Sequence, residues 1–286
     1  MAEVLDKKMI RQIFRDAHRH QRIGEIIRRF SSNKEDIRQK ALNEIDLSSC
    51  RNVLELGCAF GAFTEALKGK LHPQAKITGL DILPQYEPFF LEACRHAGYE
   101  GVFSAGGVEQ IIVYPARSFD LIICSYALYF FPDIIADIAR ILKKEGLFIT
   151  ITHSECDMQE LVEITKNILR KNNLLASGQR LPIENIVGKF SAQNGGKMLA
   201  EHFASVRSVD FKNTLIFPQH EIDYLLEYFH FKKSFFLAET LLDKQDIIEQ
   251  ILREIKNSAR EHNWVSMCKD DTIFIAAQPH AAKEKP

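Results

Sequence analysis

The ten residues LELGCAFGAF, at positions 54–63, combine an acid and two glycines within apolar surroundings. Glu55 lies two residues before Gly57, and Gly61 follows four residues later. Glycines after a buried strand let the backbone turn tightly and approach a ligand, and the N-terminus of a following helix favours negative charge. The spacing indicates a nucleotide-binding loop, although such turns also form for purely structural reasons.

Asp81 is the second residue suited to this chemistry, near the end of the apolar run ITGLDI (77–82). It follows the loop by about 20 residues, where a carboxylate can accept hydrogen bonds from both hydroxyls of a ribose. Leu83 and Pro84 follow two and three residues later and favour a ligand contact over the alternative, a helix cap. Together, the loop and the acid predict a ligand that contains a nucleoside.

Alternating strands and helices are expected to position these residues. Strand patterns cover 52–57, 76–82, 118–126 and 147–153, and helix patterns cover 62–71, 88–98 and 133–146. The run LIIC (121–124) is apolar throughout, as is typical of a parallel strand buried on both faces. The alternation predicts an α/β fold with a doubly wound parallel sheet, in which ligands bind at the carboxyl ends of the strands.

The segments outside this alternation are mostly helical in pattern. Residues 5–30 carry apolar residues at helical spacing, which predicts one or two amphipathic helices. After His153 the expected order is a helical, irregular stretch at 155–204, a strand at 205–217, helices at 218–229 and 238–261, and a final strand at 264–278.

The composition favours a cytoplasmic protein. The 286 residues carry a formal net charge of −1, so neither nucleic acid nor a membrane is the expected partner. Six cysteines are scattered without a CxxC pair, which predicts no metal site and a reducing compartment. The N-terminus lacks the apolar core of a signal peptide. The oligomeric state stays open.

Two classes of cofactor protein use this layout. A dinucleotide fingerprint would place glycines at 57, 59 and 62, but the chain has Ala59 and Ala62 at the last two. The spacing Glu55-x-Gly57-x-Ala59-x-Gly61 instead resembles the acidic-x-G-x-G-x-G motif of class I S-adenosylmethionine (SAM)-dependent methyltransferases. Two further segments are similar to the family's fourth-strand motif and to the helix and strand that follow it: SFDLIICSYALYFFPD (118–133) and IARILKKEGLFIT (138–150).

This resemblance, to a methyltransferase type 11-like domain, spans about residues 34 to 154. Segments 190–203 and 214–229 resemble the insert of a bacterial small-molecule subgroup. The resemblance implies a Rossmann-like seven-stranded sheet with an antiparallel last strand and a helical lid insertion. The implied organisation is N-terminal helices covering the site at 1–46, a SAM-binding core at 47–154, a lid and acceptor insertion at 155–204, the rest of the core sheet with helices at 205–278, and a frayed tail at 279–286.

The resemblance also implies roles for individual residues. Glu55 would position the methionine end of SAM through the loop formed by Gly57, Cys58, Ala59 and Gly61. Asp81 would bind the ribose, Ile82 and Val108 would pack on the adenine, and Ser125 and Tyr126 would lie near the methionine. The family usually carries an acid before the position of Val108, and this chain has Gly107 there.

Two residues are candidates for a catalytic role, Tyr126 at the end of the fourth strand and His153 at the end of the fifth. His153 is the better general base because its unperturbed pKa is near neutral. The alternative for His153 is a hydrogen-bonded structural histidine, and a tyrosine such as Tyr126 is more often a pocket wall than a catalyst. Methyl transfer requires a base only if the acceptor loses a proton early.

The expected activity is methyl transfer from SAM to nitrogen or oxygen of a small molecule by in-line displacement. An RNA or tRNA methyltransferase is the first alternative, supported by arginines in the N-terminal stretch. Acidic residues are interleaved with them, which favours a solvated helix face. The [DN]-P-P-[YF] signature of many base-amine methyltransferases is absent. A SAM-binding protein without catalysis is the second alternative.

Overall fold

The computed structural model describes residues 2–280, which fold into two compact units. We call the first the helical unit, which comprises residues 2–34, 153–189 and 212–271. The second is the sheet unit, with residues 35–152, 190–211 and 272–280. The tail predicted for 279–286 falls outside the described residues after position 280.

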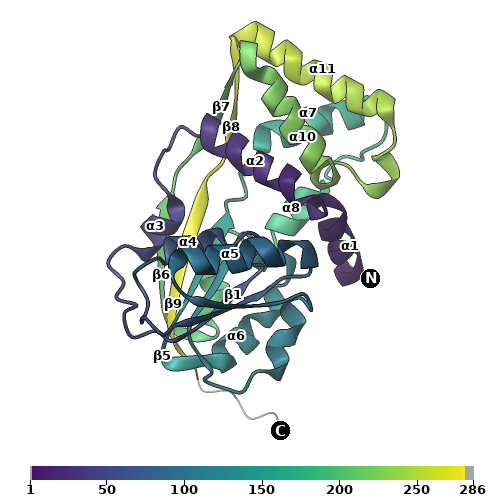
Figure 1. Ribbon diagram of the computed structural model, residues 1–286. Coiled ribbons are helices and arrows are strands. Elements are labelled where there is room, and N and C mark those ends of the chain that lie inside the picture. Colours follow the sequence, from purple (N-terminus) through teal and green to yellow (C-terminus); the bar gives the residue numbers. More distant parts are fainter. Residues whose placement is uncertain (1, 281–286) are drawn as a thin grey trace. The chain divides into compact units, whose positions relative to one another are not determined.

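The sheet unit is built on a seven-stranded sheet with the order β3-β2-β1-β4-β5-β9-β6 (Figure 1). Its strands are β1 (Asn52–Leu56), β2 (Lys76–Leu80), β3 (Glu100–Ser104), β4 (Phe119–Ser125), β5 (Leu142–His153), β6 (Phe203–Phe211) and β9 (Asp271–Pro279). Strands β1 to β5 pair in parallel, and the last strand is antiparallel. The predicted α/β fold with a Rossmann-like sheet is therefore confirmed.

Helices cover both faces of this sheet because its central strands are apolar on both sides. Leu121 and Ile123 of β4 join one core cluster with α3 (Ile37–Leu42), α4 (Ala62–Ala66) and α5 (Glu87–Ala97). Ile122 and Cys124 alternate with them and are also fully buried, so they face the other side of the sheet. Figure 1 shows α6 (Ile135–Ile141) on the side away from α4 and α5, and α9 (Gly195–Ala200) precedes β6.

The helical unit packs six helices and a two-stranded antiparallel sheet. The helices are α1 (Ala2–Phe14), α2 (Ala17–Phe30), α7 (Gln159–Lys171), α8 (Pro182–Val187), α10 (Ile222–Phe236) and α11 (Gln245–His262). Strand β7 (Thr214–Pro218) pairs with β8 (Trp264–Cys268). Among residues 2–280, no helix combines the length and the hydropathy needed to cross a bilayer.

Two predicted strands are wrong in one respect, because each is divided between the two units. The strand predicted at 205–217 is β6 followed by β7, and the strand at 264–278 is β8 followed by β9. Both break at the same level, where Lys269 N–H donates to the Asn213 carbonyl (3.0 Å) and Asn213 N–H donates to Asp270 Oδ1 (2.9 Å). Sequence patterning does not reveal this break because the paired residues are far apart in the chain.

Several predicted boundaries also move. The helix predicted at 62–71 ends at Ala66, and the strand β3 has no counterpart among the predicted elements. The helix predicted at 133–146 ends at Ile141, because residues 142–146 join β5 through an irregular pairing with β4. Gly146 fits there because a Cβ would lie 2.9 Å from the Asp120 carbonyl oxygen.

Candidate cofactor site

The loop between β1 and α4 is held against the end of β2 by backbone hydrogen bonds. Gly57 N–H and Cys58 N–H both donate to the Leu80 carbonyl (2.8 and 3.3 Å), and Gly61 N–H donates to the Cys58 carbonyl (2.8 Å). Gly57, Ala59 and Gly61 all have positive φ, at 65°, 41° and 69°. The left-handed conformation explains the glycines in the motif, and Ala59 tolerates it at an energetic cost.

Gly61 is required for a second reason, which is close packing. A Cβ at this position would lie 2.7 Å from Ala93 Cβ and 3.2 Å from Phe90 Cδ2, both on α5. Glycine therefore allows the start of α4 to approach α5.

We expect Gly61→Ala to lower the free energy of unfolding by roughly 2–4 kcal/mol, through overpacking added to left-handed strain. Gly69→Ala is the matched control, because Gly69 also has positive φ (71°) but nothing lies within 4 Å of its added Cβ. The control should lose only about 1 kcal/mol. Urea unfolding measures both, and equal losses would contradict the close-packing explanation.

Asp81 joins the end of β2 to this loop. Its Oδ2 accepts from Ala59 N–H and its Oδ1 accepts from Leu83 N–H, both at 3.0 Å. The side chain is largely buried, and burial raises the pKa of its carboxyl group despite these backbone donors. A carboxylate has about four acceptor sites, so two remain for a ligand that donates hydrogen bonds.

Glu55 lies beneath the loop in β1. It is 3% exposed, and Thr64 in the first turns of α4 donates its hydroxyl hydrogen to Glu55 Oε2 at 2.5 Å. Burial raises the pKa of Glu55 to about 7, against the opposing effect of the Thr64 hydrogen bond. Glu55 thus connects β1 with α4, which flank the loop.

The segment after β3 brings Gly107, Val108 and Ile82 to the same end of β2. Asp81 N–H donates to the Ser104 carbonyl, and Gly107 N–H donates back to the Asp81 carbonyl, both at 3.1 Å. Val108 is buried at the start of the 3-10 helix Val108–Val113. The structure therefore places these three residues beside Asp81, and the adenine contact of Ile82 and Val108 stays a prediction.

Glu109 was missed by the sequence reasoning. A Cβ built on Gly107 would lie 2.9 Å from Glu109 Oε2 and 3.9 Å from Ile82 Cβ. The Glu109 carboxylate thus occupies the space next to Gly107 where the family's acid is expected. An acid two residues past the motif position is the only sequence signal, and the positive φ of Gly107 (75°) is what brings it back.

The end of β4 adds the remaining residues predicted within the sheet unit. Ser125 is the last residue of β4, and Tyr126 follows with φ of 56° and donates its N–H to the Ile151 carbonyl (2.9 Å). A Cβ on Gly57 would lie 2.8 Å from Ala127 Cβ. This end of β4 therefore packs directly against the glycine loop, and a left-handed non-glycine residue is a feature that often accompanies functional sites.

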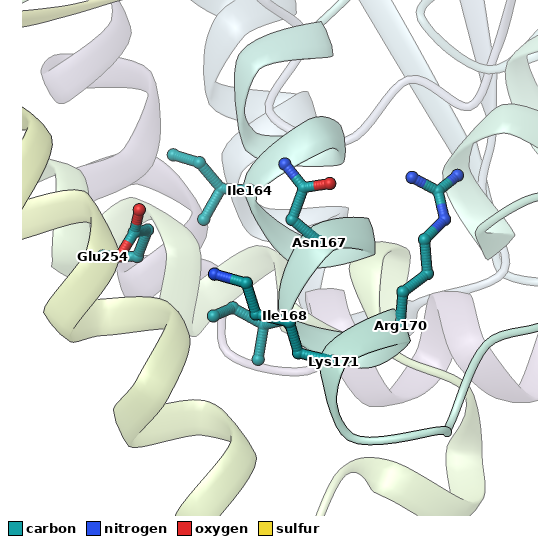
Figure 2. A pocket seen from close by; sticks show the side chains of 6 residues that line it. All are labelled: Ile164, Asn167, Ile168, Arg170, Lys171 and Glu254. Atoms are coloured by element: carbon teal, nitrogen blue, oxygen red, sulfur yellow. The ribbon is translucent and has the colours of Figure 1, made fainter.

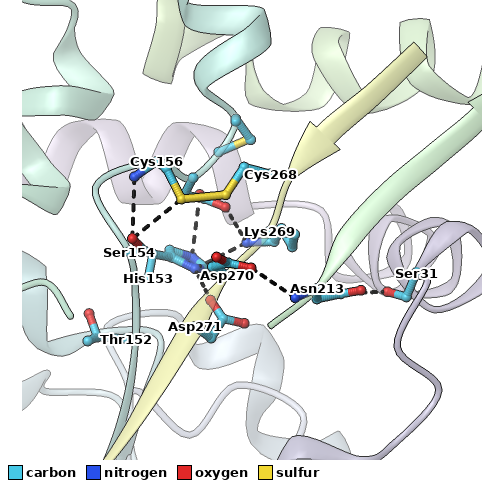
Figure 3. A network of polar contacts seen from close by, with 12 residues as sticks. Ser31, Thr152, His153, Ser154, Cys156, Asn213, Cys268, Lys269, Asp270 and Asp271 are labelled. Carbon is cyan, nitrogen blue, oxygen red and sulfur yellow. Dashed lines mark hydrogen bonds and ion pairs between the residues drawn. A yellow bond between two sulfur atoms is a disulfide. The ribbon is translucent and has the colours of Figure 1, made fainter. Parts of the chain in front are cut away.

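His153, the other catalytic candidate, belongs to a buried ionic cluster in the helical unit (Figure 3). Its Nδ1 lies 2.7 Å from Asp271 Oδ1 and 3.1 Å from Lys269 Nζ. Lys269 Nζ also donates to Asp157 Oδ1 at 2.8 Å. Burial would raise the pKa of Asp157, but the charges of His153 and Lys269 outweigh it and lower that pKa. The alternative of a structural, hydrogen-bonded histidine gains support from these contacts, and a catalytic role stays a prediction.

The cysteines divide into two classes. Cys58 and Cys124, the two nearest the predicted site, are buried free thiols whose pKa values are raised by burial. Cys156 and Cys268 form a disulfide across 112 residues of sequence, which their spacing did not indicate. The sequence analysis did not foresee this pairing, because the two cysteines are far apart in the chain.

A separate groove lies between α7 and α11 of the helical unit (Figure 2). Its lining residues are Ile164, Asn167, Ile168, Arg170, Lys171 and Glu254. None of the residues predicted to bind the cofactor or to act in catalysis lines this groove.

Comparison with known proteins finds methyltransferases similar to part of the sheet unit. The sequence profile described as "Methyltransferase domain" matches residues 54–150. The chain is 29% identical over 132 residues to the uncharacterized methyltransferase YcgJ of Bacillus subtilis, which covers 44% of this chain and 51% of YcgJ. It is 31% identical over 88 residues to the aklanonic acid methyltransferase DauC of Streptomyces, which covers 31% of this chain and 40% of DauC.

The matched part thus spans about half the length of these curated relatives or less. The crystal structure of YcgJ has a TM-score of 0.51 to this chain at 17% identity, covering 92% of this chain and 100% of that one, which shows a shared fold. Residues 54–150 therefore match the methyltransferase domain, and the chain shares its fold with YcgJ.

Proposed function

We propose that the protein binds SAM at the end of β1 and β2 and transfers its methyl group to a small molecule. The observation that carries this proposal is Asp81, whose carboxylate is held by two backbone N–H groups and keeps two acceptor sites for a ribose diol. The glycine loop beside it lets a ligand approach the backbone. These features fit SAM.

The chain's own residues would bind SAM and orient it toward the acceptor, and they would not need to activate the methyl group. When bound, SAM supplies an activated sulfonium methyl group, so the protein mainly aligns the acceptor and excludes water. Asp81 would hold the ribose, Ile82 and Val108 would pack on the adenine, and Glu55 would keep the loop in place. Ser125 and Tyr126 would line the methionine end.

We extend the proposal to nitrogen or oxygen as the target atom, with Tyr126 or His153 as the base if a hydroxyl is methylated. Support comes from the near-neutral net charge and from DauC, which is named for methylation of a small molecule, aklanonic acid. We assign the acceptor pocket to residues 1–46 and 155–204, and the location to the cytoplasm. These assignments rest on the sequence.

Transfer of labelled methyl groups tests the activity. The protein would be incubated with SAM carrying a ¹³C methyl group and a fractionated cell extract, and the products would be analysed by mass spectrometry. Labelled small molecules are expected, and their formation should stop in the Asp81→Ala variant. Label confined to RNA would favour the RNA methyltransferase, and SAM binding without any labelled product would favour the non-catalytic alternative.

Glu109 should take the place of the acid that the family carries at position 107. We expect Glu109→Gln to weaken SAM binding by about 3- to 10-fold, because a neutral amide accepts a weaker hydrogen bond from the adenine amino group than a carboxylate does. Calorimetric titration with SAM and with an analogue lacking the adenine amino group measures this. An equal loss for both ligands would contradict the assignment.

A further inference from the structure

The cysteines that redox reagents can reach lie together at one place, the Cys156–Cys268 disulfide. Four of the six cysteines, Cys50, Cys58, Cys94 and Cys124, are buried as free thiols. Burial is the largest cause that raises the pKa of each, which keeps them as unreactive thiols. Cys156 and Cys268 are half-buried and are joined to each other. Redox reagents should therefore act first at this pair.

The disulfide lies directly beside the buried ionic cluster in the helical unit. Cys156 precedes Asp157 and Cys268 precedes Lys269, so the bond joins the two backbones at the residues next to the Lys269–Asp157 ion pair (Figure 3). The Cα atoms of the two cysteines are 6.1 Å apart, within the usual range for a disulfide. The covalent bond and the ion pair thus hold the same two segments together.

Hydrogen bonds also join these segments at this level. Met158 N–H donates to the Cys268 carbonyl and Cys268 N–H donates to Glu160 Oε2, both at 2.9 Å. The charged pair Lys269–Asp157 is almost fully buried, with side chains 5% and 1% exposed. A buried ion pair is stable only while its geometry is good. Loss of the covalent bond should therefore weaken the Lys269–Asp157 pair.

The surroundings also suit thiol chemistry. Cys156 lies just before the N-terminus of α7, whose positive end favours a thiolate. Its Sγ contacts Ser154 Oγ at 3.4 Å, a hydroxyl that can stabilise that thiolate. The pair is therefore positioned to react both as a disulfide and as a dithiol.

We propose that Cys156 and Cys268 form a reversible thiol–disulfide site whose state controls the order of the ionic cluster around His153. A small external dithiol reduces the site: the Cys156–Cys268 bond breaks, both residues become thiols, and the dithiol becomes a disulfide. A small external disulfide drives the reverse reaction and leaves as two thiols. The proposal does not depend on SAM or on the methyl acceptor.

Equilibration in buffers of reduced and oxidised dithiothreitol or glutathione, followed by thiol trapping and peptide mass spectrometry, tests the chemistry. We expect Cys156 and Cys268 to be trapped together over one redox interval while the other four cysteines stay protected. Trapping of all six only on global unfolding would overturn the proposal. Failure of the bond to form in the oxidising buffer would also overturn it.

Hydrogen exchange tests the structural consequence in the same samples. Reduction should speed exchange of the Met158 and Cys268 amides by about 10-fold or more while the amides of β1 keep their rates. Cys156→Ser should show the fast rates in every buffer. In the control Cys94→Ala, a change in the sheet unit, the Met158 and Cys268 amides should respond to reduction as in wild type. Unchanged rates on reduction would contradict control of the cluster.

A metal ion is the competing occupant, because Cys156, Cys268 and Asp270 have donor atoms within 4.8 Å of one another. Two thiolates and a carboxylate would suit Zn²⁺. Native mass spectrometry of the reduced protein with added Zn²⁺ decides between the two. Stoichiometric zinc that is lost in Cys156→Ser and blocks disulfide formation would overturn the redox proposal, whereas disulfide formation in the presence of zinc would support it.

Discussion

Asp81→Ala is expected to weaken SAM binding by at least roughly 100-fold. The substitution removes two charge-assisted acceptor sites for the ribose, each worth about 1.5–3 kcal/mol. It also removes the acceptor of the Ala59 and Leu83 N–H groups, so the loop loses its connection to the end of β2. Equilibrium dialysis with labelled SAM measures the change.

The control is Asp133→Ala, which removes an exposed carboxylate from the same unit. Asp81→Asn is an intermediate change, because its amide oxygen still accepts from one backbone N–H while its amide nitrogen faces the other N–H, and one ribose acceptor is lost. We expect an intermediate loss of SAM affinity for this variant and a thermal midpoint below that of wild type. If Asp81→Ala binds SAM as the control does, the ribose assignment is wrong.

The second large effect concerns Glu55 and pH. Its pKa is raised from 4.5 to about 7 in the folded chain, mainly by burial. The folded state therefore holds a proton that the unfolded state has already released, and stability falls as pH rises from about 4.5 to about 7. Complete ionisation would cost at most about 3.5 kcal/mol, taking about 1.4 kcal/mol per pKa unit.

Glu55→Gln should remove this part of the pH dependence. We expect its free energy of unfolding, measured in urea between pH 4.5 and 8, to decline less steeply than that of wild type. Near pH 4.5 the free energy of unfolding of Glu55→Gln should not exceed that of wild type. Above pH 7 the difference between the two should shift in favour of the variant. Glu145→Gln, an exposed substitution in the same unit, is the control. Parallel curves for wild type and Glu55→Gln would contradict the raised pKa.

The sheet unit was largely predictable because its signals are local. The apolar run of β4, the glycine loop and Asp81 lie within short stretches whose order fixes the topology. The strand β3 was missed since its sequence, EGVFS, is only partly buried and shows no clear alternation. The predicted helix at 62–71 was longer than α4. The apolar spacing of AFTEALKGKL does not indicate that Gly69 adopts a left-handed conformation.

The helical unit depends on contacts that no local pattern reports. Asn213 and Asp270 end two strands at the same level although they are 57 residues apart. His153 was correctly placed at a strand end, but Lys269 and Asp271, which surround it, come from the other end of the chain. The disulfide partner of Cys156 is equally remote. Glu109 shows the same limit on a small scale, because the turn at Gly107 decides where its carboxylate lies.

Calorimetric titration of the wild-type protein with SAM, and separately with NAD, tests most directly whether the loop of Gly57 to Gly61 and Asp81 form a SAM site. Binding of one SAM per chain is predicted, with no heat from NAD beyond dilution. Protection of the loop amides from hydrogen exchange in the same complex would locate the ligand. Binding of NAD instead of SAM, or of neither, would contradict the account.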